Sequence, residues 1–239
     1  PGTIYINTAE RRLYLVLGNG QAIRYGIGVG RDGFRWSGQA DWLVDLTLFH
    51  NRPRVLGEVA ESAGAVVTAY ETGPFGGEAL ASVLFGDVNP SGKLPYNYPR
   101  YPNALINYIH KPSEEQKAAE GVYNYEADYS PQYSFGDGLS YTTFEYKDLK
   151  LDTTSIPADG SVEVSVQLTN TGNRAGKEVV ELYSSDLYAT GITPDMRRLR
   201  RFAKVELQPG ETRTVSFKLK AEDLAYVNNE GKTVLEPGD

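Results

Sequence analysis

The chain has 239 residues, of which 40% are hydrophobic and 23% are charged, and its net charge is −7. These values are typical of a folded protein, and the acidic balance argues against a nucleic-acid partner, because phosphate backbones bind to basic surfaces. The sequence has no cysteine and only two histidines, His50 and His110, so it excludes a cysteine nucleophile and predicts no metal and no cofactor. It shows no signal peptide and no apolar run of the roughly 20 residues that a membrane helix needs, so we expect no membrane partner.

Residues 1–41 predict a β-meander. Residues 3–8 and 11–17 alternate apolar with polar or amphipathic side chains, which is the period of a half-buried strand. Asn19 and Gly20 follow the second run, and both tolerate the positive φ angles of a tight hairpin turn. A third strand is expected after this turn.

Gly28, Gly30 and Gly33 have the G-x-G-x-x-G spacing of a dinucleotide-binding turn. In that motif a helix begins at the last glycine, and its N-terminus holds the pyrophosphate. The residues after Gly33, FRWSGQADW, contain no helical run. We therefore expect a glycine-rich hairpin here rather than a nucleotide site.

Residues 42–137 alternate strand and helix patterns, which predicts a partial α/β sandwich with a parallel sheet. The expected elements are strands at 43–49 and 64–70 and helical segments at 57–63 and 78–86. Tyr70 and Glu71 stand at the C-terminal end of the second strand, where open α/β sheets gather their ligands. They are the candidate substrate-binding residues, although Glu71 is also compatible with an ordinary solvated loop acid.

The stretch 87–116 is rich in Pro, Asn and Gly and predicts an irregular surface segment. Its tyrosines could stack on sugar rings, since tyrosine joins an apolar face to a polar tip. The alternative that we favour is that they hold a proline-rich loop against the domain. The residues concerned are Tyr96, Tyr98, Tyr101 and Tyr108.

Residues 196–205, MRRLRRFAKV, contain four arginines. An anionic cell-wall polymer is one partner that such a run could bind. We favour a strand whose charged positions face solvent while Leu199, Phe202 and Val205 turn inward.

Residues 138–239 predict an all-β domain. The run SVEVSVQLT places Val162, Val164, Val166 and Leu168 on one face, and TVSFKL repeats this period with Val215, Phe217 and Leu219. Turn-rich stretches separate these and other short strands, which is typical of an immunoglobulin-like β-sandwich.

Residues 3–38 resemble the opening strands of the catalytic domain of the L,D-transpeptidases, a family that crosslinks peptidoglycan. The chemistry of that family needs a cysteine nucleophile with a nearby histidine. Because the chain has no cysteine, transpeptidase activity is excluded.

A second resemblance covers residues 43–239. GGEALASVLFGDVNPSGKLPYNYP (76–99) is similar to the C-terminal α/β-sandwich domain of family-three glycoside hydrolases, which include β-glucosidases and β-xylosidases. FGDGLSYTTFEY (135–146) resembles the link to their last domain, and residues 164–183 and 205–219 resemble that fibronectin type III-like domain. The resemblance implies one further closing strand after Asp239, and the unpaired sheet edges suggest a homo-oligomer.

The same resemblance implies that the aspartate nucleophile lies on a preceding barrel and the acid/base glutamate upstream of this match. No catalytic residue can therefore be placed in the chain, and we expect the C-terminal portion of a β-glycosidase acting on a β-glucoside or β-xyloside, inactive alone. The alternatives are a non-catalytic carbohydrate- or cell-wall-binding module and a chimeric fragment without activity. The resemblance implies a periplasmic or extracellular location.

Overall fold

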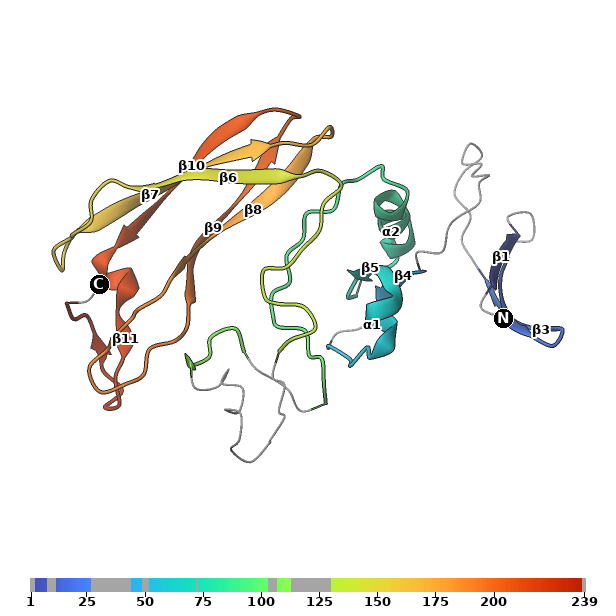
Figure 1. Ribbon diagram of the computed structural model, residues 1–239, viewed down its shortest axis with the longest axis horizontal. Coiled ribbons are helices and arrows are strands. Elements are labelled where there is room, and N and C mark those ends of the chain that lie inside the picture. Colours follow the sequence, from blue (N-terminus) through green and yellow to red (C-terminus); the bar gives the residue numbers. More distant parts are fainter. Residues whose placement is uncertain are drawn as a thin grey trace, which may run out of the picture. The chain divides into compact units, whose positions relative to one another are not determined.

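The computed structural model describes residues 3–7, 12–26, 44–48, 52–71, 73–102, 107–112 and 130–237. The chain forms two compact units, which Figure 1 shows in sequence colours. Unit 1 contains residues 1–51 and 62–84, and unit 2 contains residues 52–61 and 85–239. The three predicted segments differ from these units, and their boundaries stay a prediction. The G-x-G-x-x-G motif and His50 lie outside the described residues.

Unit 1 begins with a three-stranded antiparallel meander of β1 (Thr3–Asn7), β2 (Arg12–Gly18) and β3 (Gln21–Gly26). Asn19 and Gly20 connect β2 to β3 with φ angles of 51° and 75°. Positive φ at both central residues gives a two-residue turn whose twist matches that of the flanking strands. The predicted strands and hairpin are confirmed.

Unit 1 also contains a parallel strand pair, β4 (Val44–Leu48) with β5 (Ala63–Thr68). The chain runs through α1 (Glu58–Ser62) between them, and α2 (Gly76–Leu84) follows β5. Parallel neighbours need such a crossover connection, because a hairpin can join only antiparallel strands. Gly86 follows α2 with a φ of 83°, the left-handed conformation that commonly ends a helix.

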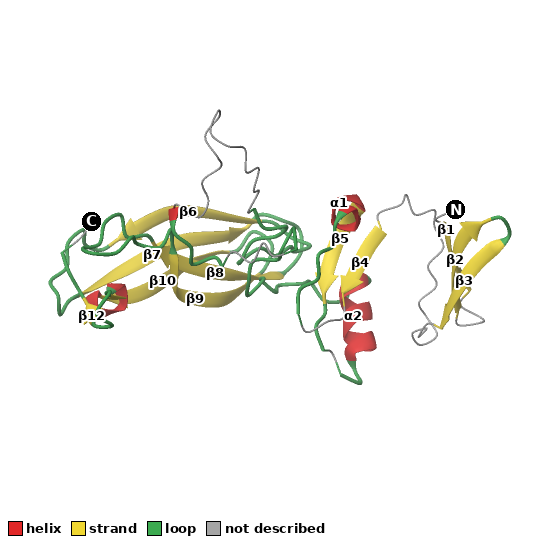
Figure 2. Cartoon of the chain, turned by 90° about the horizontal axis from the view of Figure 1, so that it is seen from below, coloured by secondary structure: helices red, strands yellow, loops and turns green. Residues whose placement is uncertain are grey.

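Unit 2 is built on two antiparallel sheets, whose strands Figure 2 shows in yellow. One sheet has the order β10 (Thr212–Lys220), β7 (Ser161–Asn170), β6 (Phe144–Leu151). The other pairs β8 (Gly176–Ser184) with β9 (Arg198–Leu207). A short 3₁₀ helix, η2 (Ala221–Leu224), and the hairpin β11 (Tyr226–Val227) with β12 (Thr233–Val234) follow β10.

The core of unit 2 draws on both sheets, as the period-two pattern requires. Leu168 of β7 and Leu207 of β9 are fully buried, and they share one apolar cluster with Val180, Val205 and Val215. A second cluster contains Val162, Val164 and Leu219. The predicted inward faces of β7 and β10 are confirmed.

The prediction that Phe202 turns inward is wrong. Phe202 is 69% exposed, whereas Val205 and Leu207 are buried. Neighbouring strand residues point to opposite faces, so positions 202 and 205 cannot share one face of a regular strand. The burial of Val205 therefore turns Phe202 outward.

The irregular segment predicted at 87–116 is confirmed for its described residues, and part of it pairs with residues 132–137. Leu94 N–H donates to the carbonyl of Asp137 at 2.8 Å, and Gly136 N–H donates to that of Leu94 at 2.9 Å. Tyr98 and Tyr133 form an isolated antiparallel bridge farther along. Residues 94–98 and 132–137 thus satisfy each other's backbone groups beside the sandwich.

Candidate functional site

Tyr70 and Glu71 lie just beyond the C-terminal end of β5, which ends at Thr68. Tyr70 has a φ of 50°, an uncommon backbone conformation for a residue other than glycine. Tyr70 as a whole residue is 37% exposed, and Glu71 is also exposed. Their role in substrate binding stays a prediction.

The tyrosines of the segment 94–112 mostly serve packing. Tyr98 is 1% exposed, and its ring meets the rings of Tyr96 and Tyr133 at centroid distances of 6.1 and 6.0 Å. Tyr108 stacks on Phe135 at 4.0 Å. Tyr101 is 44% exposed. A continuous sugar platform across the four tyrosines is not formed, because Tyr98 has no surface to offer.

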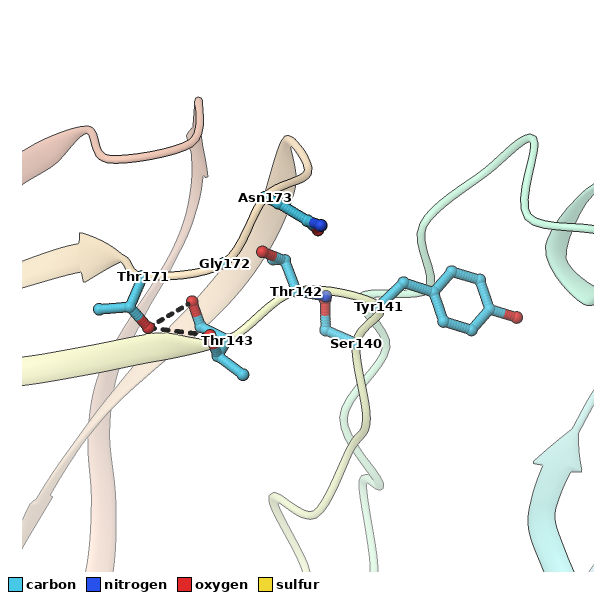
Figure 3. Close-up of a pocket in the computed structure, with 7 residues that line it drawn as sticks. All are labelled: Ser140, Tyr141, Thr142, Thr143, Thr171, Gly172 and Asn173. Atoms are coloured by element: carbon cyan, nitrogen blue, oxygen red, sulfur yellow. Dashed lines mark hydrogen bonds between the residues drawn. The ribbon is translucent and has the colours of Figure 1, made fainter.

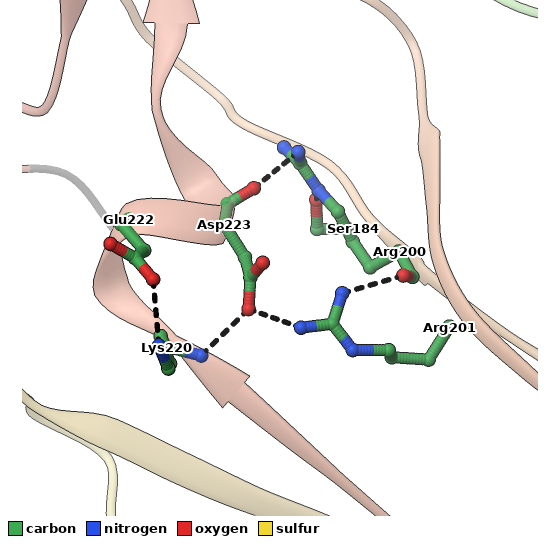
Figure 4. A network of polar contacts seen from close by, with 6 residues as sticks. All are labelled: Ser184, Arg200, Arg201, Lys220, Glu222 and Asp223. Carbon is green, nitrogen blue, oxygen red and sulfur yellow. Dashed lines mark hydrogen bonds and ion pairs between the residues drawn. The ribbon is translucent and has the colours of Figure 1, made fainter.

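Two of the arginines in the run 197–201 bind the turn that follows β10, as Figure 4 shows. Arg200 donates from Nε to Ser184 Oγ at 2.7 Å and from a terminal nitrogen to the backbone carbonyl of Asp223. Arg201 pairs with the Asp223 carboxylate. The backbone N–H of Lys220 and then Arg201 keep the pKa of Asp223 below its usual range. This part of the run connects β9 to η2.

The other two arginines also have partners inside unit 2. The guanidinium of Arg197 lies over the Tyr183 ring, 4.9 Å from its centroid. Arg198 pairs with Asp195 at 2.7 Å, and Lys111 pairs with the same carboxylate at 2.6 Å. All four arginines of the run therefore make internal contacts, which removes the basis for proposing an anionic polymer as its partner.

Asp195 connects residues 107–112 to the start of β9. Burial raises the pKa of Asp195, but the hydrogen bonds and charges of Lys111 and Arg198 outweigh it and hold this pKa below its usual 3.8. A lowered folded-state pKa contributes stability above the unfolded pKa, and this contribution disappears as the pH falls through the folded pKa. The interaction of Asp195 with Lys111 and Arg198 therefore weakens only in acid.

We expect Asp195→Asn to lower the free energy of unfolding by about 1 kcal/mol at about pH 7 and by less at an acidic pH, where the Asp195 carboxylate takes up a proton. The reason is that both proteins lack the negative charge in strong acid. Urea denaturation of both proteins at each pH measures the difference. Glu230→Gln is the control, because Glu230 forms an exposed pair with Lys232. A deficit of equal size at both pH values would contradict this account.

An open hollow of about 510 Å³ with both polar and apolar lining lies in unit 2 where the link into the sandwich meets the β7–β8 turn. Figure 3 shows the side chains around it. The lining residues are Ser140, Tyr141, Thr142, Thr143, Thr171, Gly172 and Asn173. The lining is uncharged and consists of hydroxyls, one amide, one phenol and backbone.

Two asparagines hold the backbone of this hollow. Asn170 is fully buried, and its Oδ1 accepts from Thr142 Oγ1 at 2.7 Å and from Gly172 N–H at 3.1 Å. Asn89 Oδ1 accepts from Ser140 Oγ at 2.9 Å and from Tyr141 N–H at 2.8 Å. Sequence reasoning treated the surroundings of both only as turns. The only local signal was the turn-rich composition around each asparagine, and it does not reveal these distant partners.

Side chains of β8 also connect the sandwich to the segment that precedes it. Glu178 pairs with Lys93 at 3.1 Å and accepts from the Tyr146 hydroxyl at 3.0 Å. Burial and then the Glu178 carboxylate raise the pKa of Tyr146, so this hydroxyl stays protonated and acts as a donor. Asn89 adds a hydrogen bond from Nδ2 to the carbonyl of Ala175 at 3.0 Å.

Within the described ranges, no group of three or more His, Asp and Glu side chains is arranged to hold a metal ion. The same residues include no helix with the length and apolar character needed to cross a membrane.

Comparison with known families finds two matches in the chain. The glycosyl hydrolase family 3 C-terminal domain matches residues 44–141, and a fibronectin type III-like domain matches residues 178–239. Neither match reaches residues 3–38, so the resemblance to L,D-transpeptidases receives no support.

The chain is similar to two glycosidases over most of its length. It is 41% identical to a β-xylosidase of Formosa agariphila over 196 residues, which cover 82% of this chain and 27% of that protein. It is 40% identical to the periplasmic β-glucosidase of Salmonella typhimurium, covering 81% and 26%. The chain thus spans about a quarter of the length of these relatives.

Two solved β-glucosidase structures are also similar to the chain. A β-glucosidase of Erythrobacter marinus has a TM-score of 0.72 and 40% identity, covering 81% of this chain and 25% of that one. A Listeria innocua β-glucosidase crystallised with glucose has a TM-score of 0.73 and 33% identity, covering 81% and 28%.

Proposed function

The chain carries the C-terminal domain of glycosyl hydrolase family 3 followed by a fibronectin type III-like domain, and from this premise we propose that it is the non-catalytic C-terminal portion of a β-glycosidase. The activity of the whole protein is hydrolysis of a terminal β-linked glucose or xylose. The chain supplies walls and support to a catalytic barrel outside the given residues. Its place of action is the periplasm or the cell exterior.

The observation that carries this proposal is the attachment of the family 3 segment to the sandwich. Asn89 and Lys93 belong to the matched range 44–141, and both bind residues of the sandwich. Arg174, on the β7–β8 turn, donates to the carbonyl of Gly86. A carbohydrate-binding module that acts alone has no need of such links, whereas a supporting domain depends on them.

Several finer features belong to the proposal. The pair β4–β5 and helix α2 belong to a partial α/β sandwich. A second copy of the chain binds at unpaired sheet edges other than β6, since Lys147, Lys150 and the bulge between them discourage pairing there. Analytical ultracentrifugation tests this association.

We expect the purified chain to release no chromophore from a chromogenic β-glucoside or β-xyloside beyond the rate in buffer. A retaining glycosidase needs two carboxyl groups about 5–5.5 Å apart, and the proposal places both outside this chain. A β-glucosidase that contains its barrel, assayed in parallel, shows that the substrates are competent.

Turnover that persists through repurification would overturn the proposal. Glu71→Gln then identifies the source, because loss of that turnover would assign a catalytic role to Glu71. Turnover that persists in this variant would point to another carboxylate of the chain.

A further inference from the structure

The hollow at residues 140–143 and 171–173 is not part of any catalytic arrangement described above. We propose that it is a surface site for a neutral glycan chain, with Tyr141 as the aromatic contact and with hydroxyl and amide groups as hydrogen-bond partners. The site goes beyond the proposed function, because it binds sugar without cleaving it. Only the choice of β-linked glycans as its ligands rests on that function.

The lining favours an uncharged polyol. Its side chains carry no formal charge, so an anionic or cationic ligand would find no ion-pair partner there. The nearby cation, Arg174, is engaged with the carbonyl of Gly86 and the ring of Tyr141. Hydroxyl and amide groups both donate and accept, which matches the hydroxyls of a sugar.

The hydroxyls of Thr143 and Thr171 keep capacity for a ligand. They bond to each other at 2.8 Å, and Thr171 Oγ1 also approaches the carbonyl of Thr143 at 3.3 Å. A hydroxyl has one donor and two acceptor positions, so this pair retains acceptor sites. Both residues and Asn173 are exposed, so a ligand can reach them from solvent.

Tyr141 supplies the apolar contact. Tyr141 is 42% exposed as a whole residue, and the Arg174 guanidinium lies over its ring, 5.6 Å from the centroid. Its backbone N–H is held by Asn89. A ring fixed in this way can receive the C–H face of a sugar without losing much conformational entropy on binding.

The backbone under the site is also fixed in advance. Thr171 N–H donates to the carbonyl of Thr143 at 2.9 Å, and Asn170 holds both Thr142 and Gly172. Preorganised groups lower the cost of binding, which matters at an open surface where each contact is weak. The volume of about 510 Å³ falls in the usual range of ligand sites of roughly 300–1,000 Å³.

Native affinity electrophoresis of the full chain tests the proposal. The gels contain mixed-linkage β-glucan, xylan, soluble starch or no polysaccharide. We expect retardation by β-glucan or xylan, and about a tenfold loss of affinity, equivalent to about 1.4 kcal/mol, in Tyr141→Ala. Asn173→Ala should weaken binding as well. Tyr188→Ala is the matched control, because Tyr188 is 73% exposed and lies outside the hollow.

Each outcome has a defined meaning once circular dichroism has shown that the variants are folded. Retardation lost in Tyr141→Ala and kept in Tyr188→Ala supports the site. If starch alone retards the chain in this way, the glycan site stands and the choice of β-linked glycans as its ligands is wrong. Absence of retardation in every gel, or retardation equal in all variants, overturns the site and leaves the proposed function untouched.

Discussion

Replacing Asn170 with alanine is expected to lower the free energy of unfolding of unit 2 by about 3–5 kcal/mol. The Asn170 side chain is fully buried and bonds to four groups. It donates to the carbonyls of Arg174 at 2.7 Å and Leu207 at 3.1 Å, and accepts from Thr142 and Gly172. Removal of the amide leaves these polar groups without their partner in a region closed to solvent, which costs more than the bonds themselves contribute.

Urea denaturation followed by far-ultraviolet circular dichroism measures this loss. Both tryptophans, Trp36 and Trp42, precede residue 44, so tryptophan fluorescence does not report directly on the sandwich. Asn173→Ala is the matched control, because Asn173 lies on the same turn but is exposed, and we expect a change within about 0.5 kcal/mol. Equal effects of the two substitutions would show that burial of Asn170 does not stabilise the fold.

Replacing Gly138 with alanine is expected to destabilise unit 2 by about 3 kcal/mol. A Cβ atom at this position would lie 2.2 Å from the carbonyl oxygen of Gly92 and 2.9 Å from Cδ of Lys93. The Lys93 side chain can move, but the Gly92 carbonyl belongs to backbone that pairing of Leu94 with Asp137 holds in place. Relief of the clash therefore requires residues 92–94 and 137–138 to separate.

Gly92→Ala provides an unusually close control for this substitution. Gly92 faces Gly138 across the same contact, yet a Cβ atom on Gly92 would have no neighbouring atom within 4 Å. We expect Gly92→Ala to change the free energy of unfolding by less than about 0.5 kcal/mol. If both variants were equally stable, the close approach of Gly138 to Gly92 would be wrong.

These two predictions concern the connection on which the proposed function depends. Gly138 belongs to the link into the sandwich, and Asn170 holds the first residues after that link through Thr142. Loss of either contact should loosen the attachment of the family 3 segment. The glycan site shares this backbone, so we expect Asn170→Ala to lower both glycan binding and the stability of unit 2. Asn173→Ala should weaken glycan binding while the fold stays stable.

The sequence predicted correctly those features that depend on neighbouring residues. The alternation of Val162, Val164 and Leu168 located the buried face of β7, because strand side chains alternate at every position. Asn19 with Gly20 predicted the β2–β3 turn, because their backbones accept positive φ. The error at Phe202 has the same origin. Phe202 and Val205 are three positions apart, so the alternation of a strand places them on opposite faces.

The candidate site was much less accessible to sequence reasoning. Tyr70 and Glu71 were chosen from their place after a strand, and their role is still a prediction. The tyrosine-rich segment was recognised from the sequence. Its conformation, however, is held by pairing with residues 132–137 and by stacking of Tyr108 on Phe135, which the sequence does not reveal. No local sequence motif marks the residues that line the hollow.

By itself the sequence determined the strand periods, the main turns, the absence of cysteine chemistry and the resemblance of residues 43–239 to a glycosidase C-terminal region. Only the tertiary structure decided which polar residues hold the domain together. Asn89 reaches Ala175 across 86 positions, and Asn170 reaches Leu207 across 37. Such contacts leave no periodic trace, because a hydrogen bond depends on where two distant segments meet and not on the pattern within either of them.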